Sequence, residues 1–394
     1  MTIEELSSYF TPLSMENIGF KQNVGFEKWG DKLTINLDTN TFPDIDDTFD
    51  MAIIGVQEDR LSINDKGSAH NPDMVRRYFY PLMPQECNLK ILDAGNLIIG
   101  NQPKDTYCAL SEVVAFFLQK KIIPIVIGGS NDLAIGVYNG YVKISQIINI
   151  FALDAKFDLQ DDEQEVNDEN FLQEIICSDP NYLFDYTHAG YQTYFVDSKA
   201  LSLLDDLRFE RLRLGKVQEN ISRIEPFVRD ADMFMVDMNC VRASDAPASF
   251  SPHGLYGEQL CKIANYAGMS DKLTSICFFG NNTLNDLGGR GSHIIAHAIY
   301  YFIDGYLWRK NDYPYMNDGN YLEFRVLTQD LQNEITFYKS KKSDRWWVQV
   351  PCNNEMKRKY LRHYIVPCLH EDYLQAGKGE LPERFLIAYN KLNI

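Results

Sequence analysis

Acidic side chains follow two hydrophobic stretches of the sequence, at the points where buried strands would end. In IFALDAKFD the apolar run gives way to Asp154 and Asp158, which bracket Lys156, and in MFMVDMN the run ends near Asp237. A carboxylate beside a buried strand needs a partner, because an unpaired buried charge is costly. Carboxylates that converge in this way are typical of a metal site. The lysine between two of them is unexpected there, since its charge repels a metal ion.

A third hydrophobic stretch ends in GGSNDL, where Gly128 and Gly129 allow a tight turn that brings Asn131 toward the same region. Ligands of open parallel sheets bind beyond the carboxyl ends of the strands. The three strand ends therefore predict either a binding site or a buried polar network that ties the strands together. Spacing alone fits both interpretations.

Alternating strands and helices would position these residues. Short apolar stretches are predicted to be strands buried on both faces, and they cover residues 51–56, 121–129, 147–154, 191–197, 232–239 and 273–280. Stretches 106–121, 257–268 and 292–306 have the apolar periodicity of helices. The alternation predicts an α/β fold, a three-layer α/β/α sandwich with a mainly parallel, doubly wound sheet.

The organisation of the chain favours a single domain over residues 1–394, because no linker rich in proline, glycine or serine divides it. Residues from about 323 to 394 are interpreted as an appended C-terminal segment, β-rich at first, that packs on this domain. Its Trp346 and Trp347 are predicted to serve packing or an interface. The acidic stretch 158–170 is interpreted as a solvated loop or, because it leaves a strand end with candidate site residues, as a loop at the mouth of a cleft.

Composition limits the classes of function. The 394 residues include 38 basic and 55 acidic ones, a formal net charge of −17, which argues against nucleic acid or an anionic membrane as a partner. The first residues lack the pattern of a secretion signal, and no apolar run reaches the roughly 18 residues of a membrane span. The cysteines are scattered singly, as in proteins of a reducing compartment. We therefore expect a soluble, cytoplasmic protein.

The motifs, taken in order, resemble those of a known family. GGSND, DAKFD, VDMN with DAPA, and HGL stand in the order of GGDHS, DAHxD, SxDxDxxDPxxAP and a Gly-Gly-Leu turn in the arginase/agmatinase/formimidoylglutamase family, the ureohydrolases. The resemblance runs from about residue 55 to 306, and GVQEDRLSINDKG looks closest to the formimidoylglutamase-like branch. It implies an arginase-like fold and hydrolysis of a linear amidine or guanidine at two manganese ions, which two histidines and four aspartates bind. As partners we expect a small amidine or amino-acid-like ligand and further copies of the chain in a homo-oligomer.

Several positions that the resemblance assigns to the metal site depart from the family pattern. Asn131 and Lys156 stand where the family has histidines, and Asn239 replaces the second aspartate of the third motif. The glutamate that holds the amidinium group falls at about Phe279. The aspartates that remain are Asp154, Asp158 and Asp237. The dinuclear manganese site is therefore expected to be degraded.

Of these departures from the family pattern, Lys156 affects metal binding most directly. A protonated ammonium offers no lone pair to a metal, and neighbouring carboxylates favour its protonated form. At about 4 Å and an effective dielectric near 20 it would repel a dication by on the order of 8 kcal/mol. We expect no cofactor, with the ammonium hydrogen-bonded to at least one aspartate in place of a metal. The alternative is a single Mn²⁺, Mg²⁺ or Ca²⁺ ion bound by the residual ligands Asn131, Asp154, Asp158 and Asp237.

A cysteine, two histidines on one helix and a glycine-rich turn are further candidates for reactive or ligand-binding roles. Cys240 would be a thiolate nucleophile if His188 or His253 were its base, although an inert buried cysteine is commoner. His293 and His297 are spaced like a metal pair, but their helix is apolar and lacks the glutamate of HExxH, which favours simple packing. The glycine-rich turn GGRG that follows lacks a phosphate-binding motif.

Three hypotheses about function remain open. In the first, the protein is a pseudoenzyme or a binding protein that has lost hydrolase activity. In the second, it is an active C–N hydrolase of a formiminoglutamate-like amidine or a guanidine that uses one metal or none. In the third, it performs different chemistry at Lys156 or Cys240. The catalytic residues stay unassigned, with Asp154, Lys156 and Asp237 as candidates.

Overall fold

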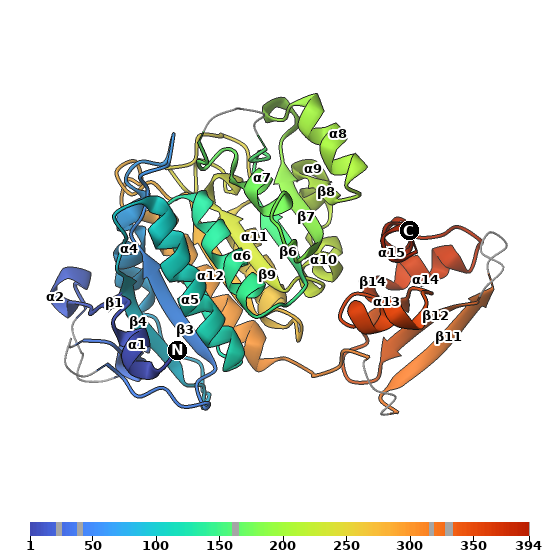
Figure 1. Ribbon diagram of the computed structural model, residues 1–394, viewed down its shortest axis with the longest axis horizontal. Helices are drawn as coiled ribbons and strands as arrows, with labels where there is room; N and C mark the ends of the chain where they lie inside the picture. The colour runs from blue at the N-terminus through green and yellow to red at the C-terminus, as the bar shows by residue number, and fades with distance from the viewer. Residues whose placement is uncertain (21–25, 38–41, 160–164, 315–318, 328–333, 394) are drawn as a thin grey trace.

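A computed structural model describes residues 1–20, 26–37, 42–159, 165–314, 319–327 and 334–393. They form a large α/β domain and a smaller C-terminal unit that lies beside it (Figure 1). Each part has its own sheet, of ten strands in the large domain and of four in the C-terminal unit.

The large sheet has the strand order β1-β4-β3-β5-β10-β9-β6-β7-β8, with β2 beside β4. Its pairings are parallel except that of β1 with β4. The strands are β1 (Phe10–Thr11), β2 (Thr34–Ile35), β3 (Met51–Val56), β4 (Ile91–Leu97), β5 (Ile123–Ile127), β6 (Ile148–Leu153), β7 (Leu183–Tyr191), β8 (Glu210–Arg213), β9 (Met233–Asp237) and β10 (Ser275–Phe279). The central strands β5, β10, β9 and β6 are buried along their whole length.

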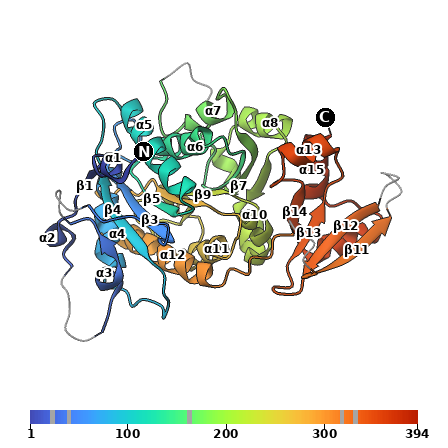
Figure 2. The same ribbon diagram turned by 60° about the horizontal axis from the view of Figure 1, so that its bottom comes forward.

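Helices cover both faces of this sheet, and successive strand residues alternate between two hydrophobic cores. In β9, for example, Phe234 and Val236 face the core under α4, α11 and α12, whereas Met233 and Met235 face the core under α5, α6 and α7 (Figures 1 and 2). The helices are α1 (Ile3–Ser7), α2 (Met15–Ile18), α3 (Trp29–Lys32), α4 (Asn71–Phe79), α5 (Pro103–Gln119), α6 (Ala134–Lys143), α7 (Phe171–Ile176), α8 (Ser198–Asp206), α9 (Leu214–Glu219), α10 (Glu225–Arg229), α11 (Gly257–Gly268) and α12 (Arg290–Leu307). This arrangement confirms the three-layer α/β/α sandwich that the sequence predicted.

The structure corrects one predicted strand. Residues 191–197 were predicted as a strand, but β7 is Leu183–Tyr191 and the chain then enters a short 3-10 helix, Thr193–Phe195. The error arises because β7 carries buried polar side chains such as Asp185 and His188, which interrupt the apolar pattern. The predicted helices correspond to α5, α11 and α12. None of the helices in the described part of the chain combines the length and hydropathy that a membrane crossing requires.

The C-terminal unit has an antiparallel sheet in the order β11-β12-β13-β14, covered by three helices. Its elements are β11 (Tyr321–Leu327), β12 (Glu334–Ser340), β13 (Trp346–Gln349), α13 (Asn354–Lys359), β14 (Ile365–Cys368), α14 (His370–Ala376) and α15 (Glu383–Leu392). Phe337, Trp346 and Phe385 belong to a hydrophobic core of its own. Trp347 instead lies against the large domain, where the Arg229 guanidinium stacks on its ring at 4.4 Å.

Buried ion pairs join the two parts at the amino ends of the large sheet. Asp230 and Asp232, which precede β9, pair with Lys272 at 2.8 and 3.8 Å. From the C-terminal unit, Arg384 reaches Asp230 at 3.4 Å, and Arg362 reaches Asp232 at 2.6 Å. Further pairs of this set are Arg384 with Glu210 at the start of β8 and Lys391 with Asp185 in β7. These acids are therefore each matched by a fixed cation.

Candidate functional site

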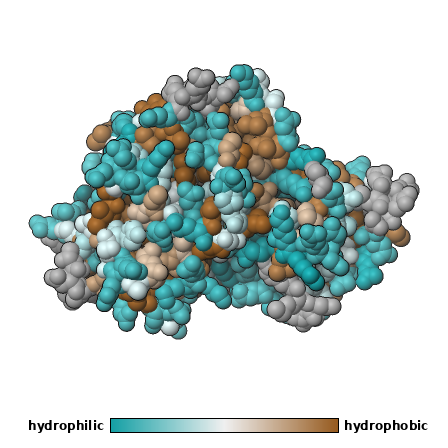
Figure 3. Space-filling model, in the orientation of Figure 1, coloured by the Kyte–Doolittle hydropathy of each residue, from teal (hydrophilic) through white to brown (hydrophobic). Residues whose placement is uncertain are grey.

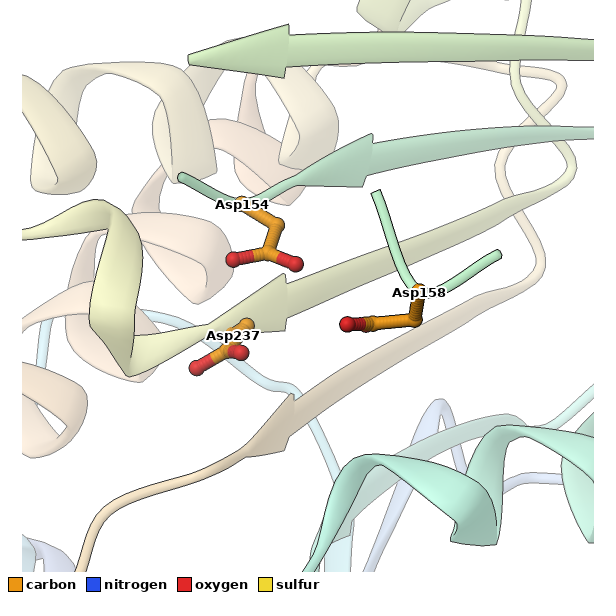
Figure 4. A group of neighbouring side chains, drawn as sticks. All are labelled: Asp154, Asp158 and Asp237. Carbon is orange, nitrogen blue, oxygen red and sulfur yellow. The ribbon is translucent and has the colours of Figure 1, made fainter. Parts of the chain in front are cut away.

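Three aspartates meet at the opposite, carboxyl ends of the strands. Asp154 follows β6, Asp158 lies four residues further on, and Asp237 is the last residue of β9. All three are buried and lie together at the ends of β6 and β9 (Figure 4). One oxygen from each lies within 4.8 Å of the others. The structure thus brings together the three aspartates that the sequence predicted to converge.

The charges of these aspartates are poorly compensated. Burial raises the pKa of Asp154, Asp158 and Asp237, and for Asp154 the nearby charges of Asp237 and Asp158 raise it further. Asp154 Oδ2 and Asp158 Oδ1 are buried and accept no hydrogen bond from any described residue. Buried polar atoms normally have a partner, so two unpaired carboxylate oxygens in one cluster mark a place where a proton or a cation would bind.

Lys156 does not contact the aspartates as predicted. Its Nζ pairs with Glu169 Oε1 at 2.5 Å, and among the described residues it forms no hydrogen bond to the three aspartates. The pair is not fully buried: the side chains keep exposed fractions of 18% and 14%, so the ammonium avoids complete desolvation. Burial opposes its charge, but Asp158, Glu169 and Asp154 together raise the pKa of Lys156 above its ordinary value. Lys156 is therefore a protonated cation at the edge of the cluster.

The two asparagines act mainly on Asp237. Asn131, in the 3-10 helix Asn131–Leu133 after β5, donates through Nδ2 to Asp237 Oδ2 at 2.5 Å. The backbone N–H of Asn239 donates to Asp237 Oδ1 at 2.7 Å, and its Nδ2 points to Asp65 Oδ2 at 3.3 Å. Their amide nitrogens rather than their oxygens therefore face the carboxylates.

Asp65 and two acids of the loop before α7 complete the site, and sequence reasoning did not identify them. Burial, followed by the charges of Asp237 and Asp168, raises the pKa of Asp65 to about 8. Asp168 accepts hydrogen bonds from Ser62 Oγ at 2.6 Å and from the N–H of Ile63 at 2.9 Å. The only sequence feature that indicated a role for this loop was the acidic character of residues 158–170. No sequence feature indicated a role for Asp65.

The described part of this loop lies against the site. Asn64 donates to Glu169 Oε1 at 2.6 Å, next to the contact of Glu169 with Lys156. Together with the bonds of Asp168, this contact fastens the loop to residues 62–64. Residues 160–164 of the predicted acidic loop lie outside the described residues.

The end of β10 carries no charged side chain at Phe279 or Gly280. Phe279, near which the family's glutamate was expected, is buried in the hydrophobic core under α5 and α6. The next residue, Gly280, has a φ of 71°, and a Cβ there would lie 2.3 Å from Asp237 Oδ1. A side chain at position 280 would therefore collide with the carboxylate cluster.

Cys240 does not have the surroundings of a nucleophile. It is buried, and burial raises the pKa of its thiol well above the ordinary value. His188 lies inside β7, where burial lowers its pKa to about 3 and its ring atoms face Tyr186 Oη and the Asp154 carbonyl. The described hydrogen bonds of His253 are those of its backbone: its carbonyl accepts from Gln192 Nε2, and its N–H donates to Ser251 Oγ. The cysteine hypothesis is thus not supported by the geometry.

The remaining sequence candidates are structural. His293 and His297 pack with ring centroids 4.5 Å apart on α12, and His293 stacks on Tyr78. At the start of α12, the carboxylate of Asp286 accepts from the N–H groups of Gly291 and Ser292 at 2.9 and 3.0 Å. The helix end that follows the glycine-rich turn is therefore already capped by an acid.

A pocket of about 370 Å³ lies beyond the end of β7, and its lining includes none of the three aspartates. Gln192, which follows β7, belongs to its lining, and its N–H donates to the Ala155 carbonyl at 2.8 Å. Arg213 and Arg242 also line the pocket, and the Arg242 guanidinium stacks on Tyr256 at 3.8 Å. The Arg242 Nε also pairs with Asp245 Oδ1 at 2.9 Å, whereas no ion pair with a described residue engages Arg213. The Arg213 guanidinium therefore favours a ligand that carries a carboxylate.

Comparisons with known proteins agree with the motifs. Residues 49–303 match the Arginase family profile. Formimidoylglutamases of Staphylococcus haemolyticus and Staphylococcus aureus are 28% and 26% identical over 284 and 247 residues, which cover 66% and 60% of this chain and 87% and 79% of those proteins.

Solved structures show the same fold. Formimidoylglutamase from Bacillus subtilis aligns with a TM-score of 0.65 at 17% identity over 75% of this chain and 99% of that chain. Formiminoglutamase from Trypanosoma cruzi, solved with manganese, aligns with a TM-score of 0.62 at 17% identity over 68% of this chain and 96% of that chain. On its profile match, its relatives and its fold, the chain belongs to the arginase family.

Proposed function

We propose that this protein is an arginase-family member that has lost dinuclear manganese catalysis and binds a small amidine or amino-acid-like ligand. The observation that carries the proposal is the protonated ammonium of Lys156, paired with Glu169, at a position where the family motif has a histidine ligand. An ammonium there supplies positive charge without the coordination chemistry that activates water.

The residues present fit one divalent cation rather than two. Asp154, Asp158 and Asp237 offer carboxylate oxygens within 4.8 Å of one another, and two of these residues have an oxygen that no described residue engages. Oxygen ligands of this kind suit Mg²⁺, Ca²⁺ or Mn²⁺. A bound ion would supply positive charge that polarises a substrate or lowers the pKa of a water molecule. A second ion would meet Lys156 and the amide nitrogen of Asn239 instead of ligands.

The surroundings of the cluster support binding of an amino-acid-like ligand. Gly280 leaves no side chain at the end of β10 to hold an amidinium group. The neighbouring pocket, lined by Arg213, suits a carboxylate instead. Gln192 links this pocket to the cluster through its hydrogen bond to the Ala155 carbonyl, next to Asp154. This link supports a ligand whose carboxyl group binds at Arg213 and whose amino group is directed to the aspartates.

Metal content tests the first part of the proposal. Protein purified with and without added Mn²⁺ should contain at most one equivalent of metal by elemental analysis. Lys156→His should raise the manganese content, because it restores a neutral nitrogen ligand, whereas the same change at the exposed Lys216 should leave it unchanged. Two tightly bound ions in the parent protein would contradict the proposal.

Activity and ligand binding test the second part. Release of urea or formamide from arginine, agmatine or formiminoglutamate should stay at background, while formiminoglutamate or glutamate raises the melting temperature. Arg213→Met should weaken that shift, with Arg223→Met on the neighbouring surface as its control. A turnover in the ordinary range of about 1–1000 per second would show that the protein is an active enzyme.

A second candidate function is a C–N hydrolase that uses a single cation. It is favoured by the two unpaired oxygens of Asp154 and Asp158. This candidate predicts hydrolysis of formiminoglutamate that rises with added metal and saturates at one equivalent. It also predicts that Asp158→Asn abolishes turnover, whereas the ligand-binding proposal predicts no turnover to lose.

A further inference from the structure

Strand β11 forms an edge of the C-terminal sheet. Among the described strands it pairs only with β12, in a register that joins Tyr321 to Ser340 and Leu327 to Glu334. The views in Figures 1 and 2 place it on the side of the C-terminal unit that faces away from the large domain. An edge strand of this length presents backbone groups to a further strand.

The backbone of β11 fixes which residues would pair with such a strand. The N–H of Lys341 donates to the Asn320 carbonyl at 2.8 Å, so Asn320 and every second residue after it direct their backbone groups to β12. The alternate residues, Glu323 and Arg325 among them, direct theirs to the outer edge. In an added antiparallel strand, these alternate residues would form the hydrogen-bonded pairs.

The side chains of β11 alternate between two faces. One face carries the exposed Glu323 and Arg325, 3.7 Å apart, with Tyr321 and the exposed Leu327 at its ends. Arg325 also lies 3.8 Å from Glu334 of β12. Leu322, Phe324 and Val326 lie on the other face; Phe324 and Val326 pack on the core of the unit, while Leu322 keeps an exposed fraction of 46%. A partner strand would therefore need one apolar face and opposite charges at matching positions.

We propose that β11 pairs antiparallel with β11 of a second copy of this chain, around a two-fold axis at Phe324. In this register Glu323 of each copy lies opposite Arg325 of the other, so two oppositely charged pairs form. Leu322 lies opposite Val326 twice on the apolar face, and the two Phe324 rings meet on the axis. The same surface patch then serves both copies, as a two-fold interface requires.

The charges select this register over its neighbours. An axis at Glu323 would place two glutamates opposite each other, and an axis at Arg325 would place two arginines opposite each other. Directly opposed like charges destabilise a strand pair, whereas opposite charges stabilise it. With the axis at Phe324, every residue of β11 also lies opposite a residue of β11 in the other copy.

Backbone pairing, rather than a large apolar patch, would hold this dimer. In Figure 3 the C-terminal unit, at the right, is mainly hydrophilic. Main-chain hydrogen bonds supply affinity when a strand is added to a sheet edge, and side chains supply selectivity. We expect a small interface with a concentration-dependent equilibrium between monomer and dimer.

Charge reversal tests the register. Sedimentation equilibrium of the full chain over a range of concentrations should give a dissociation constant for the dimer. Glu323→Arg and Arg325→Glu should each raise that constant by about tenfold or more, because each change opposes like charges twice. The double variant restores both pairs and should dimerise like the parent. Glu112→Arg on α5 makes the same charge change in the large domain and should have no effect.

Mixing gives a second readout with the same variants. Glu323→Arg and Arg325→Glu proteins, each weakened alone, should form a mixed dimer, because every opposed pair then joins arginine to glutamate. Each variant should keep the melting temperature of the parent, since both side chains are exposed. A monomer at all concentrations, a dimer that ignores the single variants, or a double variant that fails to recover would each overturn the proposal.

Discussion

Two groups of buried acids lie at opposite ends of the same strands, and their surroundings differ. At the amino ends, Asp230 and Asp232 meet Lys272, Arg384 and Arg362. At the carboxyl ends, the clustered aspartates have no such partners among the described residues, and the nearest lysine pairs with Glu169 instead.

This difference indicates that the two groups of buried acids have different roles, one in stabilising the fold and one in binding. A buried acid that only stabilises the fold is best matched by a fixed cation, because desolvation must be compensated within the protein. An acid cluster left without a fixed cation lowers the stability of the fold and keeps its oxygens available to a ligand. The carboxyl-end cluster is therefore the part of the molecule that we assign to binding.

Removal of a fixed cation should have the largest effect. Lys272→Met leaves Asp230 and Asp232 without one of their cations, and breaking a buried pair typically costs about 3–5 kcal/mol. We expect a loss of this size in the free energy of unfolding, measured by urea denaturation. Lys216→Met, on the exposed surface, should change it by less than about 0.5 kcal/mol. Equal effects of the two variants would show that the ion pairs at the amino ends do not contribute to the free energy of unfolding.

A divalent cation should distinguish the two clusters. At a hundred times its dissociation constant, an ion that binds only the folded protein adds about 2.7 kcal/mol of stability. Ca²⁺, Mg²⁺ or Mn²⁺ should therefore raise the melting temperature of the parent. Asp158→Asn should remove this response, whereas Asp185→Asn at the amino ends should keep it. A response that survives Asp158→Asn would place the ion elsewhere.

Loss of the site lysine should have a smaller effect, which depends on pH. Lys156→Met leaves Glu169 and the aspartates without a positive neighbour, at a cost of about 1–3 kcal/mol. The raised pKa values of Asp154 and Asp158 mean that protonation relieves this repulsion as the pH falls. The drop in melting temperature should thus be larger at pH 8 than at pH 5. No drop at either pH would show that the Lys156–Glu169 pair does not stabilise the fold.

Neutralising Asp65 should stabilise the protein, unlike the substitutions above. Its pKa is raised from 3.8 to about 8, so the folded state holds this proton more tightly than the unfolded state does. Stability from this group is fully present below pH 3.8 and is lost as the pH rises to about 8. The Asp65→Asn side chain cannot ionise, so the substitution removes this loss of stability. The melting temperature of the variant should therefore exceed that of the parent by more at pH 8 than at pH 5. Asp59→Asn, at a neighbouring residue of the same segment, serves as the control.

The sequence allowed the convergence of the site to be predicted because it depends on regular patterns. Apolar periodicity located β5, β6 and β9, and parallel strands place their carboxyl ends at one edge. Asp154, Asp237 and Asn131 follow from that rule alone. Strand β7 was misplaced because its buried polar residues, including Asp185 and His188, break the apolar pattern.

Contacts between distant segments could not be predicted in this way. The partner of Lys156 depends on how the loop before α7 folds back, and no local pattern specifies that path. Asp65 lies in an irregular segment whose sequence gives no periodicity, although it meets Asn239 in the fold. The pairing of Arg384 with Glu210 likewise joins positions that no motif connects.

The ion pairs at the amino ends of the large sheet also have a consequence for the order of synthesis. Arg362, Arg384 and Lys391 are translated after every strand of the large domain, yet they neutralise acids at the starts of β7, β8 and β9. Domains usually fold in sequence as they leave the ribosome, at about 5–20 residues per second. For several seconds the nascent large domain therefore lacks these three cations: Glu210 and Asp185 are without the ion pairs that the C-terminal unit supplies, and Asp230 and Asp232 share Lys272.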